Sequence, residues 1–209
     1  MSCPVCCVLG QVDVGKTKLL DILRGSNIQK KEVGGITRQI GSTYLCKETL
    51  GQLSENTSVN IDGLLMIDTP GHDCFSQMRE IGVKTCHLAI VIVDIIKGLE
   101  NQTIQCIELL KSKNTPFIIV LNKIDRIYGW KPTTHRKLKN VFEQQNKSIL
   151  KSIKEYSNKI IGRLAELEIN ALLYYENTNP AEFVSMVPVS AKTGEGLSDL
   201  IVLISKIFK

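Results

Sequence analysis

The sequence predicts a doubly wound α/β fold with a mostly parallel, six-stranded sheet and helices on both faces. Apolar runs of strand length alternate along the chain with helical stretches, which is typical of parallel sheets. Most of these runs are continuously apolar and rich in Val and Ile, as expected for strands buried on both faces. The chain has 209 residues, of which 43% are hydrophobic and 22% charged, and this suits one globular domain.

Five strands and five helices can be assigned from these patterns. The expected strands are residues 4–10, 64–68, 88–94, 116–122 and 183–190. The expected helices are residues 16–24, 75–84, 101–113, a long one near 134–169, and 197–208. Residues 25–43, rich in Gly and polar side chains, are expected to form a loop, and residues 51–60 a surface hairpin or turn.

The segment 131–176 is expected to be a helical insertion that carries one long amphipathic helix. Its apolar stripe, at three-, four- and seven-residue steps, consists of Phe142, Ile149, Ile153, Tyr156, Ile160, Leu164 and Leu167. The basic residues Lys147, Lys151, Lys154, Lys159 and Arg163 lie off that stripe. They form either a solvated helix face or a face for RNA, and the solvated face is the favoured interpretation.

Charge and cysteine content indicate a protein of the cytoplasm. The net charge of +5 suits a solvated surface as well as an RNA partner. No apolar run is long enough to span a bilayer, and no basic segment precedes an apolar one at the N-terminus. The seven cysteines show no disulfide pattern. The run Cys3-Pro4-Val5-Cys6-Cys7 invites a zinc site, but a second pair is missing, and a buried first strand is favoured.

A complete phosphate-binding loop follows the first strand and opens the first helix. It reads Gly10-Gln11-Val12-Asp13-Val14-Gly15-Lys16-Thr17. Backbone N–H groups of such a loop point at phosphates, and we expect Asp13, Val14, Gly15 and Lys18 to line the nucleotide. Lys16 would reach the β- and γ-phosphates, and the Thr17 hydroxyl would bind Mg²⁺. The fold is therefore expected to be that of a P-loop NTPase.

A second motif, Asp68-Thr69-Pro70-Gly71-His72, ends the strand at residues 64–68. A carboxylate at the carboxyl end of a strand beside the phosphate loop can hold the Mg²⁺ shell through water. Gly71 allows a backbone N–H to approach a γ-phosphate. A lone aspartate at a strand end can also be a cap or turn residue, but the phosphate loop upstream argues against this for Asp68.

Two further motifs predict a guanine site. Asn122-Lys123-Ile124-Asp125 ends the strand at residues 116–122, and Ser190-Ala191-Lys192 ends the last strand. Asp125 can accept hydrogen bonds from N1–H and the 2-amino group of guanine, two donors that adenine lacks. The stem of Lys123 can lie over the base. A backbone N–H of the last motif can read the guanine carbonyl oxygen.

These four motifs, in this order and each at a strand end, resemble the GTP-binding domain of translational GTPases. Residues 34–41, read as GGITRQIG, are similar to switch I of translation initiation GTPases, and residues 68–72 to their switch II. Residues 122–130 and 172–175, with the Cys6-Cys7 strand, resemble the family of initiation factor 5B, the eukaryotic and archaeal relatives of bacterial initiation factor 2. The resemblance covers nearly the whole chain, although Gln11 stands where the family usually has His.

The resemblance implies a catalytic set of Lys16, His72, Thr37 and Asp13. Thr37 would be the second hydroxyl on Mg²⁺, released when the γ-phosphate is lost. His72 would position or polarise the attacking water. Asp13 has two interpretations: it points outward and is solvated, or a monovalent cation, K⁺ or Na⁺, lies between it and the triphosphate. In the second, favoured one, the backbone carbonyl of Gly35 completes the shell of the cation.

The implied function is a switch that binds GTP and, when the ribosome activates it, hydrolyses GTP to GDP and phosphate to promote ribosomal subunit joining. The implied partner is the GTPase-activating region of the large subunit. Initiator tRNA and other initiation factors would be contacted through barrel, central and tRNA-binding domains, which are expected to be absent from this chain, a monomer by itself. Two other classes stay open: a regulator that binds GTP without hydrolysing it, and an RNA-binding module that depends on the basic helix.

Overall fold

The computed structural model describes residues 3–25, 41–55, 57–69 and 76–208, with the side chains of residues 76–79 left out. The strands are β1 (Val5–Gly10), β2 (Gly41–Cys46), β3 (Gly63–Asp68), β4 (Leu88–Asp94), β5 (Phe117–Asn122), β6 (Ala171–Leu173) and β7 (Val184–Pro188). The α-helices are α1 (Lys16–Arg24), α2 (Lys47–Leu53), α3 (Ser76–Thr85), α4 (Asn101–Ser112), α5 (Leu138–Glu143), α6 (Lys147–Glu166) and α7 (Leu197–Ile207). A short 3₁₀ helix, η4 (Ile124–Arg126), follows β5.

The strands form one sheet in the order β2-β3-β1-β4-β5-β7-β6. Only the β2–β3 pair is antiparallel among the described pairs, so the expected mostly parallel α/β fold is confirmed, with seven strands instead of six. After β1, the chain forms β2 and β3 on one side of β1 and then β4 on its other side. β1 therefore lies at the point where the strand order reverses, the position at which open α/β sheets bind ligands.

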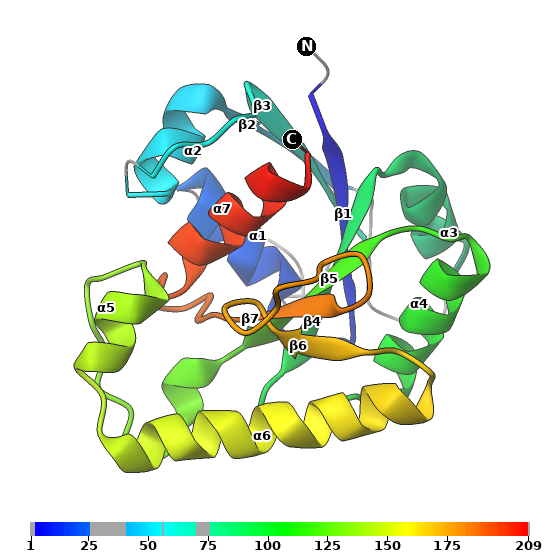
Figure 1. Cartoon of the computed structure of the whole chain (residues 1–209). Helices are drawn as coiled ribbons and strands as arrows, with labels where there is room; N and C mark the ends of the chain where they lie inside the picture. The colour runs from blue at the N-terminus through cyan, green and yellow to red at the C-terminus, as the bar shows by residue number, and fades with distance from the viewer. Residues whose placement is uncertain (1–2, 26–40, 56, 70–75, 209) are drawn as a thin grey trace.

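Two layers of helices enclose the sheet, as Figure 1 shows: α1 and α7 cover one face, and α3, α4 and α6 cover the other. All seven residues of β4 are buried, because this central strand has helices on both sides. The buried side chains of the strands and of the inner helix faces form one continuous core. Burial on both faces explains why the central strands are continuously apolar instead of alternating.

Three elements at the sides of the sheet were not expected from the sequence. β2 alternates between buried and exposed residues because it is an edge strand with one covered face. α2 has only seven residues, of which Leu50 and Leu53 are buried, and it extends into the segment expected to be a hairpin or turn. β6 has three residues and lies within the expected helical insertion. Each of these elements is too short or too polar to show a clear periodic pattern of apolar residues.

The long helix expected near residues 134–169 is divided into α5 and α6. The break follows from the buried side chain of Gln145, which accepts a hydrogen bond from Lys131 N (3.0 Å) and donates one to Lys131 O (2.7 Å). These bonds turn the chain, and Asn146 has extended backbone angles before α6 begins. Beyond the break, Ile149, Ile153 and Leu164 are buried as the apolar stripe predicted.

The basic side chains of α6 are exposed, and three of them pair with acidic side chains of the same chain. Lys151 pairs with Glu155, Lys154 with Glu176, and Arg163 with Glu166. Such exposed pairs contribute little to stability, but they offset the positive charge on this face. The pairing favours the solvated-face interpretation of α6 over an RNA-binding face.

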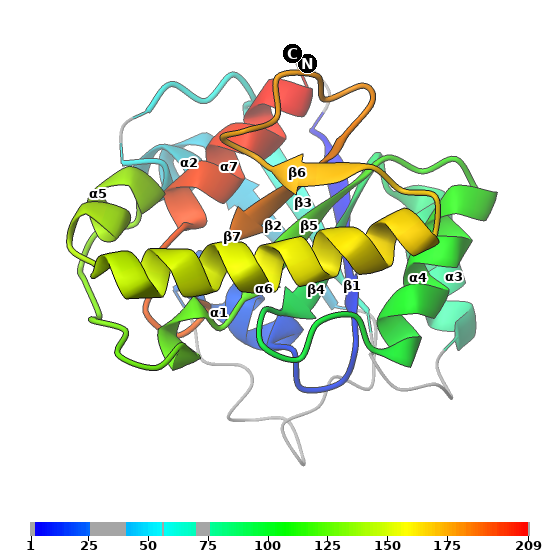
Figure 2. The same ribbon diagram turned by 60° about the horizontal axis from the view of Figure 1, so that its bottom comes forward.

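The two ends of the described chain meet at the edge of the sheet opposite to the loops that follow β1 and β4 (Figure 2). Val5 N donates to His87 Nδ1 (3.0 Å), and the His87 ring packs edge-on against Phe208 with ring centroids 6.4 Å apart. Among the described helices, none is long and apolar enough to cross a membrane.

A buried carboxylate, Glu195, holds the loop after β7 against the segment after η4. It accepts hydrogen bonds from Trp130 Nε1 (3.1 Å), Thr133 N (2.8 Å) and Thr193 Oγ1 (2.6 Å). The Glu195 side chain is fully buried, so its hydrogen bonds to these three donors cannot be exchanged for bonds to water. Glu195 therefore fixes the loop that contains the Ser190-Ala191-Lys192 motif.

Glu195→Ala should lower the free energy of unfolding by about 3 kcal/mol, because three donors lose a charged acceptor in a buried site. Glu195→Gln keeps the shape and one carbonyl oxygen, so its loss should be about 1 kcal/mol. Urea titration followed by circular dichroism measures both. A loss below about 0.5 kcal/mol in the alanine variant, the range of a neutral surface substitution, would show that Glu195 does not hold the two segments together.

Candidate nucleotide-binding site

The phosphate-binding loop connects β1 to α1 and needs glycine at both of its ends. Gly10 has φ of 145°, and a Cβ there would lie 2.5 Å from Ile92 O on β4. Gly15 has φ of 98°, and a Cβ there would lie 2.5 Å from Asn122 Nδ2. A side chain at either position would collide with the neighbouring strand or loop, so the loop keeps its conformation only with these glycines.

Lys16 lies across its own loop and is almost fully buried. Its ammonium group donates hydrogen bonds to Gly10 O (3.0 Å) and Gln11 O (2.7 Å). The loop thus holds a positive charge within the curve of its backbone, where an anion would be attracted. Val14 is buried beside it, whereas the side chains of Asp13 and Lys18 are exposed.

Thr17 and Asp68 are both buried at the same edge of the sheet. Asp68 ends β3 and is in register with Val8 on β1. The next residue, Thr69, donates from Oγ1 to Val8 O (2.7 Å), which holds the start of the second motif against β1. A hydroxyl from the first turn of α1 and a carboxylate from the end of β3 are suitable oxygen ligands for Mg²⁺ or its bound water.

The side chain of Asn122 joins three loops. Its Nδ2 donates to Val14 O in the phosphate-binding loop (2.7 Å), and its Oδ1 accepts from Ala191 N after β7 (2.9 Å). These partners lie 108 and 69 residues away in the sequence. Asn122 is almost fully buried, so both bonds are protected from water. One amide therefore places the phosphate loop and the two expected guanine motifs next to each other.

Asp125 is held in place by Ser190. The Ser190 hydroxyl donates to Asp125 Oδ1 (2.6 Å) and accepts from Lys192 N and Thr193 N (3.2 Å each). Asp125 is half-buried in η4, which begins after Lys123 in the left-handed region with φ of 69°. Ser190 thus fixes one carboxylate oxygen of Asp125. The side chain of Lys192 is exposed.

Asp94, at the end of β4, was not expected to take part in the site. Its Oδ2 accepts from Lys123 Nζ (2.8 Å), and its Oδ1 accepts from Ile96 N and Lys97 N. Burial on its own raises the pKa of Asp94, but the bonds from Lys123 and the two backbone N–H groups outweigh burial and lower it. The ion pair fixes the Lys123 stem. The only sequence signal for this role of Asp94 was that an aspartate ends a continuously apolar strand.

A second unexpected link connects the phosphate-binding loop to α4. Gln102 Oε1 accepts from Val12 N (3.3 Å), and Gln11 Oε1 accepts from Gln102 N (3.2 Å). The two glutamine side chains thus each accept one backbone N–H bond, and together they tie the phosphate-binding loop to the first turn of α4. Gln11, which departs from the usual residue of the resembling family, has a partner in this chain.

Four expected site residues lie outside the described part of the chain. They are Gly35, Thr37, Gly71 and His72. Their proposed roles at the γ-phosphate, Mg²⁺ and the attacking water stay predictions from the sequence. The described residues with an expected role, from the phosphate loop to Lys192, all lie at the carboxyl edge of the sheet.

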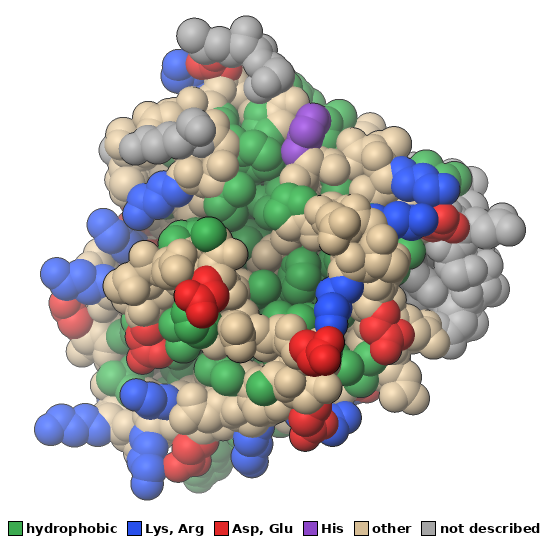
Figure 3. Space-filling model, turned by 45° about the vertical axis from the view of Figure 1, so that its right-hand side comes forward, with side chains coloured by type: hydrophobic (Ala, Val, Ile, Leu, Met, Phe, Trp, Pro, Cys, Tyr) green, Lys and Arg blue, Asp and Glu red, His purple; other side chains and the backbone are tan. Residues whose placement is uncertain are grey.

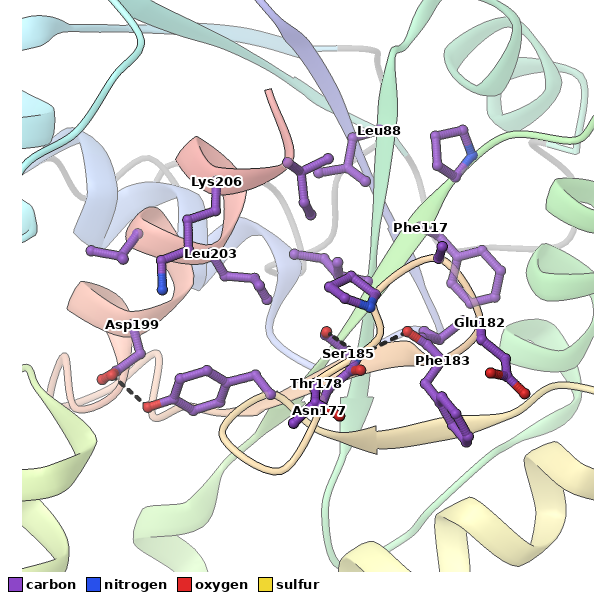
Figure 4. Close-up of a pocket in the computed structure, with 18 of the residues that line it drawn as sticks. Leu88, Phe117, Asn177, Thr178, Glu182, Phe183, Ser185, Asp199, Leu203 and Lys206 are labelled. Carbon is purple, nitrogen blue, oxygen red and sulfur yellow. Dashed lines mark hydrogen bonds between the residues drawn. The ribbon is translucent and has the colours of Figure 1, made fainter. Parts of the chain in front are cut away.

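A cavity of about 830 Å³ opens elsewhere, between α7 and the segment that joins β6 to β7. Figure 4 shows side chains such as Leu88, Phe117 and Leu203 along its wall, with Asp199 bonded to Tyr174 (2.5 Å) at one end. Figure 3 shows hydrophobic side chains gathered in a hollow on this side of the molecule. None of the described residues assigned to the nucleotide lines this cavity.

Two known proteins with similar sequences are named as translation initiation factors. The chain is 46% identical over 207 residues to eukaryotic translation initiation factor 5B of Schizosaccharomyces pombe, covering 96% of this chain and 19% of the relative. It is 40% identical over 208 residues to a probable translation initiation factor IF-2 of Metallosphaera sedula, covering 97% of this chain and 35% of the relative. The chain therefore spans between a fifth and about a third of these proteins.

Solved structures and a family model agree with these relatives. A crystal structure of GDP-bound aIF5B from Aeropyrum pernix superposes with a TM-score of 0.82 at 34% identity, covering 98% of this chain and 35% of that one. The model of the elongation factor Tu GTP binding domain matches residues 1–209. With the phosphate loop and the two guanine motifs brought together around Asn122, the chain belongs to the elongation factor Tu GTP-binding domain family.

Proposed function

We propose that this domain binds GTP and Mg²⁺ and hydrolyses GTP to GDP and phosphate as the switch of a translation initiation factor. The observation that carries the proposal is the junction at Asn122, which joins the phosphate loop to the loops after β5 and β7. A phosphate cradle and a base-reading carboxylate on a shared support fit a whole nucleotide. The similarity to initiation factors 5B and IF-2 supports the assignment to translation initiation.

Guanine is the base that suits this arrangement. Ser190 holds one oxygen of Asp125, and the carboxylate keeps acceptor capacity for the N1–H and 2-amino donors of guanine. Asp94 fixes Lys123 so that its stem can cover the base. Adenine offers neither donor, so the half-buried carboxylate would receive no hydrogen bond from the base.

The phosphates and Mg²⁺ would be held by the loop after β1. Lys16 already lies within this loop and can exchange its bonds to Gly10 and Gln11 for phosphate oxygens. Thr17 and Asp68 provide a hydroxyl and a carboxylate, and Thr37 is proposed as the second hydroxyl. When bound, Mg²⁺ would neutralise charge on the phosphate oxygens. The described residues contain no cluster of three or more His, Cys, Asp or Glu side chains for a metal, and a site shared with phosphate oxygens needs none.

The monovalent cation stays a prediction. The described side chain of Asp13 is exposed and its backbone is left-handed with φ of 63°. An exposed carboxylate is accessible to a K⁺ or Na⁺ ion, and the proposed second ligand is the carbonyl of Gly35. Such an ion would offset the repulsion between Asp13 and the triphosphate.

Hydrolysis is proposed to depend on His72 and on the ribosome. In the proposed mechanism His72 orients the attacking water, while Lys16 holds charge at the phosphates. The large-subunit GTPase-activating region would complete the site, and turnover without it would be slow. Subunit joining, contact with initiator tRNA and other initiation factors, a cytoplasmic location and a monomeric state are part of the same proposal. The relatives extend well beyond the length of this chain.

Asp125→Asn should lower GTP affinity by about a hundredfold, since two hydrogen bonds to a charged acceptor are worth about 3 kcal/mol. The same variant should gain affinity for XTP, whose 2-oxo group accepts a bond from the new amide. Competition of both nucleotides against a fluorescent GDP analogue measures the preference. Asp62→Asn, an exposed site paired with Lys47, serves as the control. If Asp125→Asn kept the wild-type preference for GTP over XTP, the guanine site would be elsewhere.

His72→Ala should keep GTP affinity within a few-fold and lose most ribosome-stimulated hydrolysis, about a hundredfold or more, because correct positioning of the attacking group contributes that much. Phosphate release with ribosomes, measured under single-turnover conditions, tests this. His135→Ala, at a half-buried histidine far along the chain, is the matched control. Unchanged stimulated turnover in His72→Ala would remove the proposed role, and equally slow wild-type turnover with and without ribosomes would favour a regulator that does not hydrolyse GTP.

A further inference from the structure

Two cysteines from different elements meet between β1 and the end of α3. Cys7 lies in β1, and Cys86 follows the last residue of α3. Their Sγ atoms are 3.1 Å apart although the residues are 79 positions apart in the sequence. Cys7 is fully buried, whereas Cys86 is half-buried and thus partly accessible from solvent. Neither thiol has a role in the proposed nucleotide site.

The fold holds both thiols in this position. Gly82 allows α3 to approach Thr69 after β3, since a Cβ there would lie 2.9 Å from Thr69 Cγ2, and the same position faces Cys7 on β1, whose Cβ would be 3.8 Å away. Cys86 N donates to Gly82 O (3.1 Å), and His87 N donates to Val5 O (2.8 Å). The backbone on either side of Cys86 is therefore anchored, once within α3 and once to β1.

The environment makes Cys86 the more reactive of the pair. Its thiol donates to Cys7 when both are protonated, and Cys7 becomes the donor when Cys86 loses its proton. This hydrogen bond from Cys7 outweighs partial burial and lowers the pKa of Cys86. The same bond, together with full burial, raises the pKa of Cys7. Reactive cysteines are those with an accessible thiolate, and only Cys86 has both properties here.

We propose that Cys7 and Cys86 form a reversible disulfide when the protein meets a peroxide. The Cys86 thiolate attacks one oxygen of hydrogen peroxide, which breaks the O–O bond, gives a sulfenic acid and releases hydroxide, later protonated to water. Cys7 Sγ then attacks Cys86 Sγ, the S–O bond breaks, and the hydroxyl leaves as water with the Cys7 proton. Both sulfurs are oxidised, and the peroxide is reduced to two waters. A dithiol reverses the reaction by thiol–disulfide exchange.

The disulfide would tie the end of α3 to the strand that leads into the phosphate-binding loop. A disulfide bond is about 2.05 Å long, so the sulfurs need to approach by about 1 Å. The bond closes a loop that contains α1, β2, α2, β3 and α3. Because it joins the end of α3 to β1, it should protect the amides of α3 from hydrogen exchange.

The test is peroxide treatment of the reduced protein, followed by alkylation of remaining thiols, digestion and mass spectrometry. We expect a peptide cross-linked between Cys7 and Cys86, two hydrogens lighter than its parts, which dithiothreitol removes. Amide exchange in α3 should slow in the oxidised protein. Both Cys86→Ser and Cys86→Ala should abolish the cross-link. Cys46→Ser, at another half-buried thiol, should leave it unchanged.

Unfolding provides a further control that needs no substitution. Wild-type protein oxidised in concentrated urea should lose the preference for Cys7–Cys86, since the fold brings the two together. The proposal is overturned if folded protein yields Cys86 sulfinic acid without a cross-link. It is also overturned if Cys86 pairs with the exposed Cys3 instead, or if the Cys7–Cys86 product forms equally well in urea.

Discussion

The buried amide of Asn122 is the interaction on which the rest of the site depends. Its two hydrogen bonds, to Val14 O and from Ala191 N, connect loops that begin at the ends of β1, β5 and β7. An amide is suited to this because it can donate and accept at once. The bond to Val14 O also restricts the next residue, Gly15, because Asn122 Nδ2 lies so close that a Cβ at position 15 would not fit. The spacing of the phosphate loop and the guanine motif is thus set by one side chain.

Parallel strand pairing makes this junction possible. β1, β4, β5 and β7 run in the same direction, so their carboxyl ends lie along a single edge. Polar groups at that edge lie at the ends of these strands or in the loops that follow them, while most residues within the strands are apolar and buried. The strands provide the stability, and the loops that follow them provide the chemistry. Asp94 and Glu195 belong to this edge as supports, the first for Lys123 and the second for the loop after β7.

Much of the fold could be predicted from local patterns. The bounds of β4 and α1 agree with the sequence-based expectation, because β4 is continuously apolar and α1 starts at a motif with known context. β2 and β6 were missed, since an edge strand alternates and a three-residue strand has no period. The division between α5 and α6 was missed because it depends on Gln145, whose amide pairs with the backbone of Lys131. Such long-range side-chain bonds leave no periodic signal.

The candidate site, too, could be predicted only in part from the sequence. The order of the four motifs predicted which residues contact nucleotide, but the residues that orient them became apparent only in three dimensions. Ser190 was expected as part of a motif that reads the base through its backbone, whereas its hydroxyl positions Asp125. The pairing of Gln11 with Gln102 shows how a departure from the usual family residue is accommodated. Sequence patterns indicate chemistry, and packing determines how that chemistry is held.

Amide hydrogen exchange in Asn122→Ala, measured without nucleotide, tests most directly whether this side chain couples the loops. Loss of a buried hydrogen bond of about 1.4 kcal/mol corresponds to about tenfold faster exchange. We expect such an increase at Ala191 and, together with it, at Gly15, Lys16 and Thr17. Asn158→Ala, an exposed position on α6, should leave these amides unchanged. Faster exchange at Ala191 alone, with the phosphate loop protected as in the wild type, would contradict the coupling.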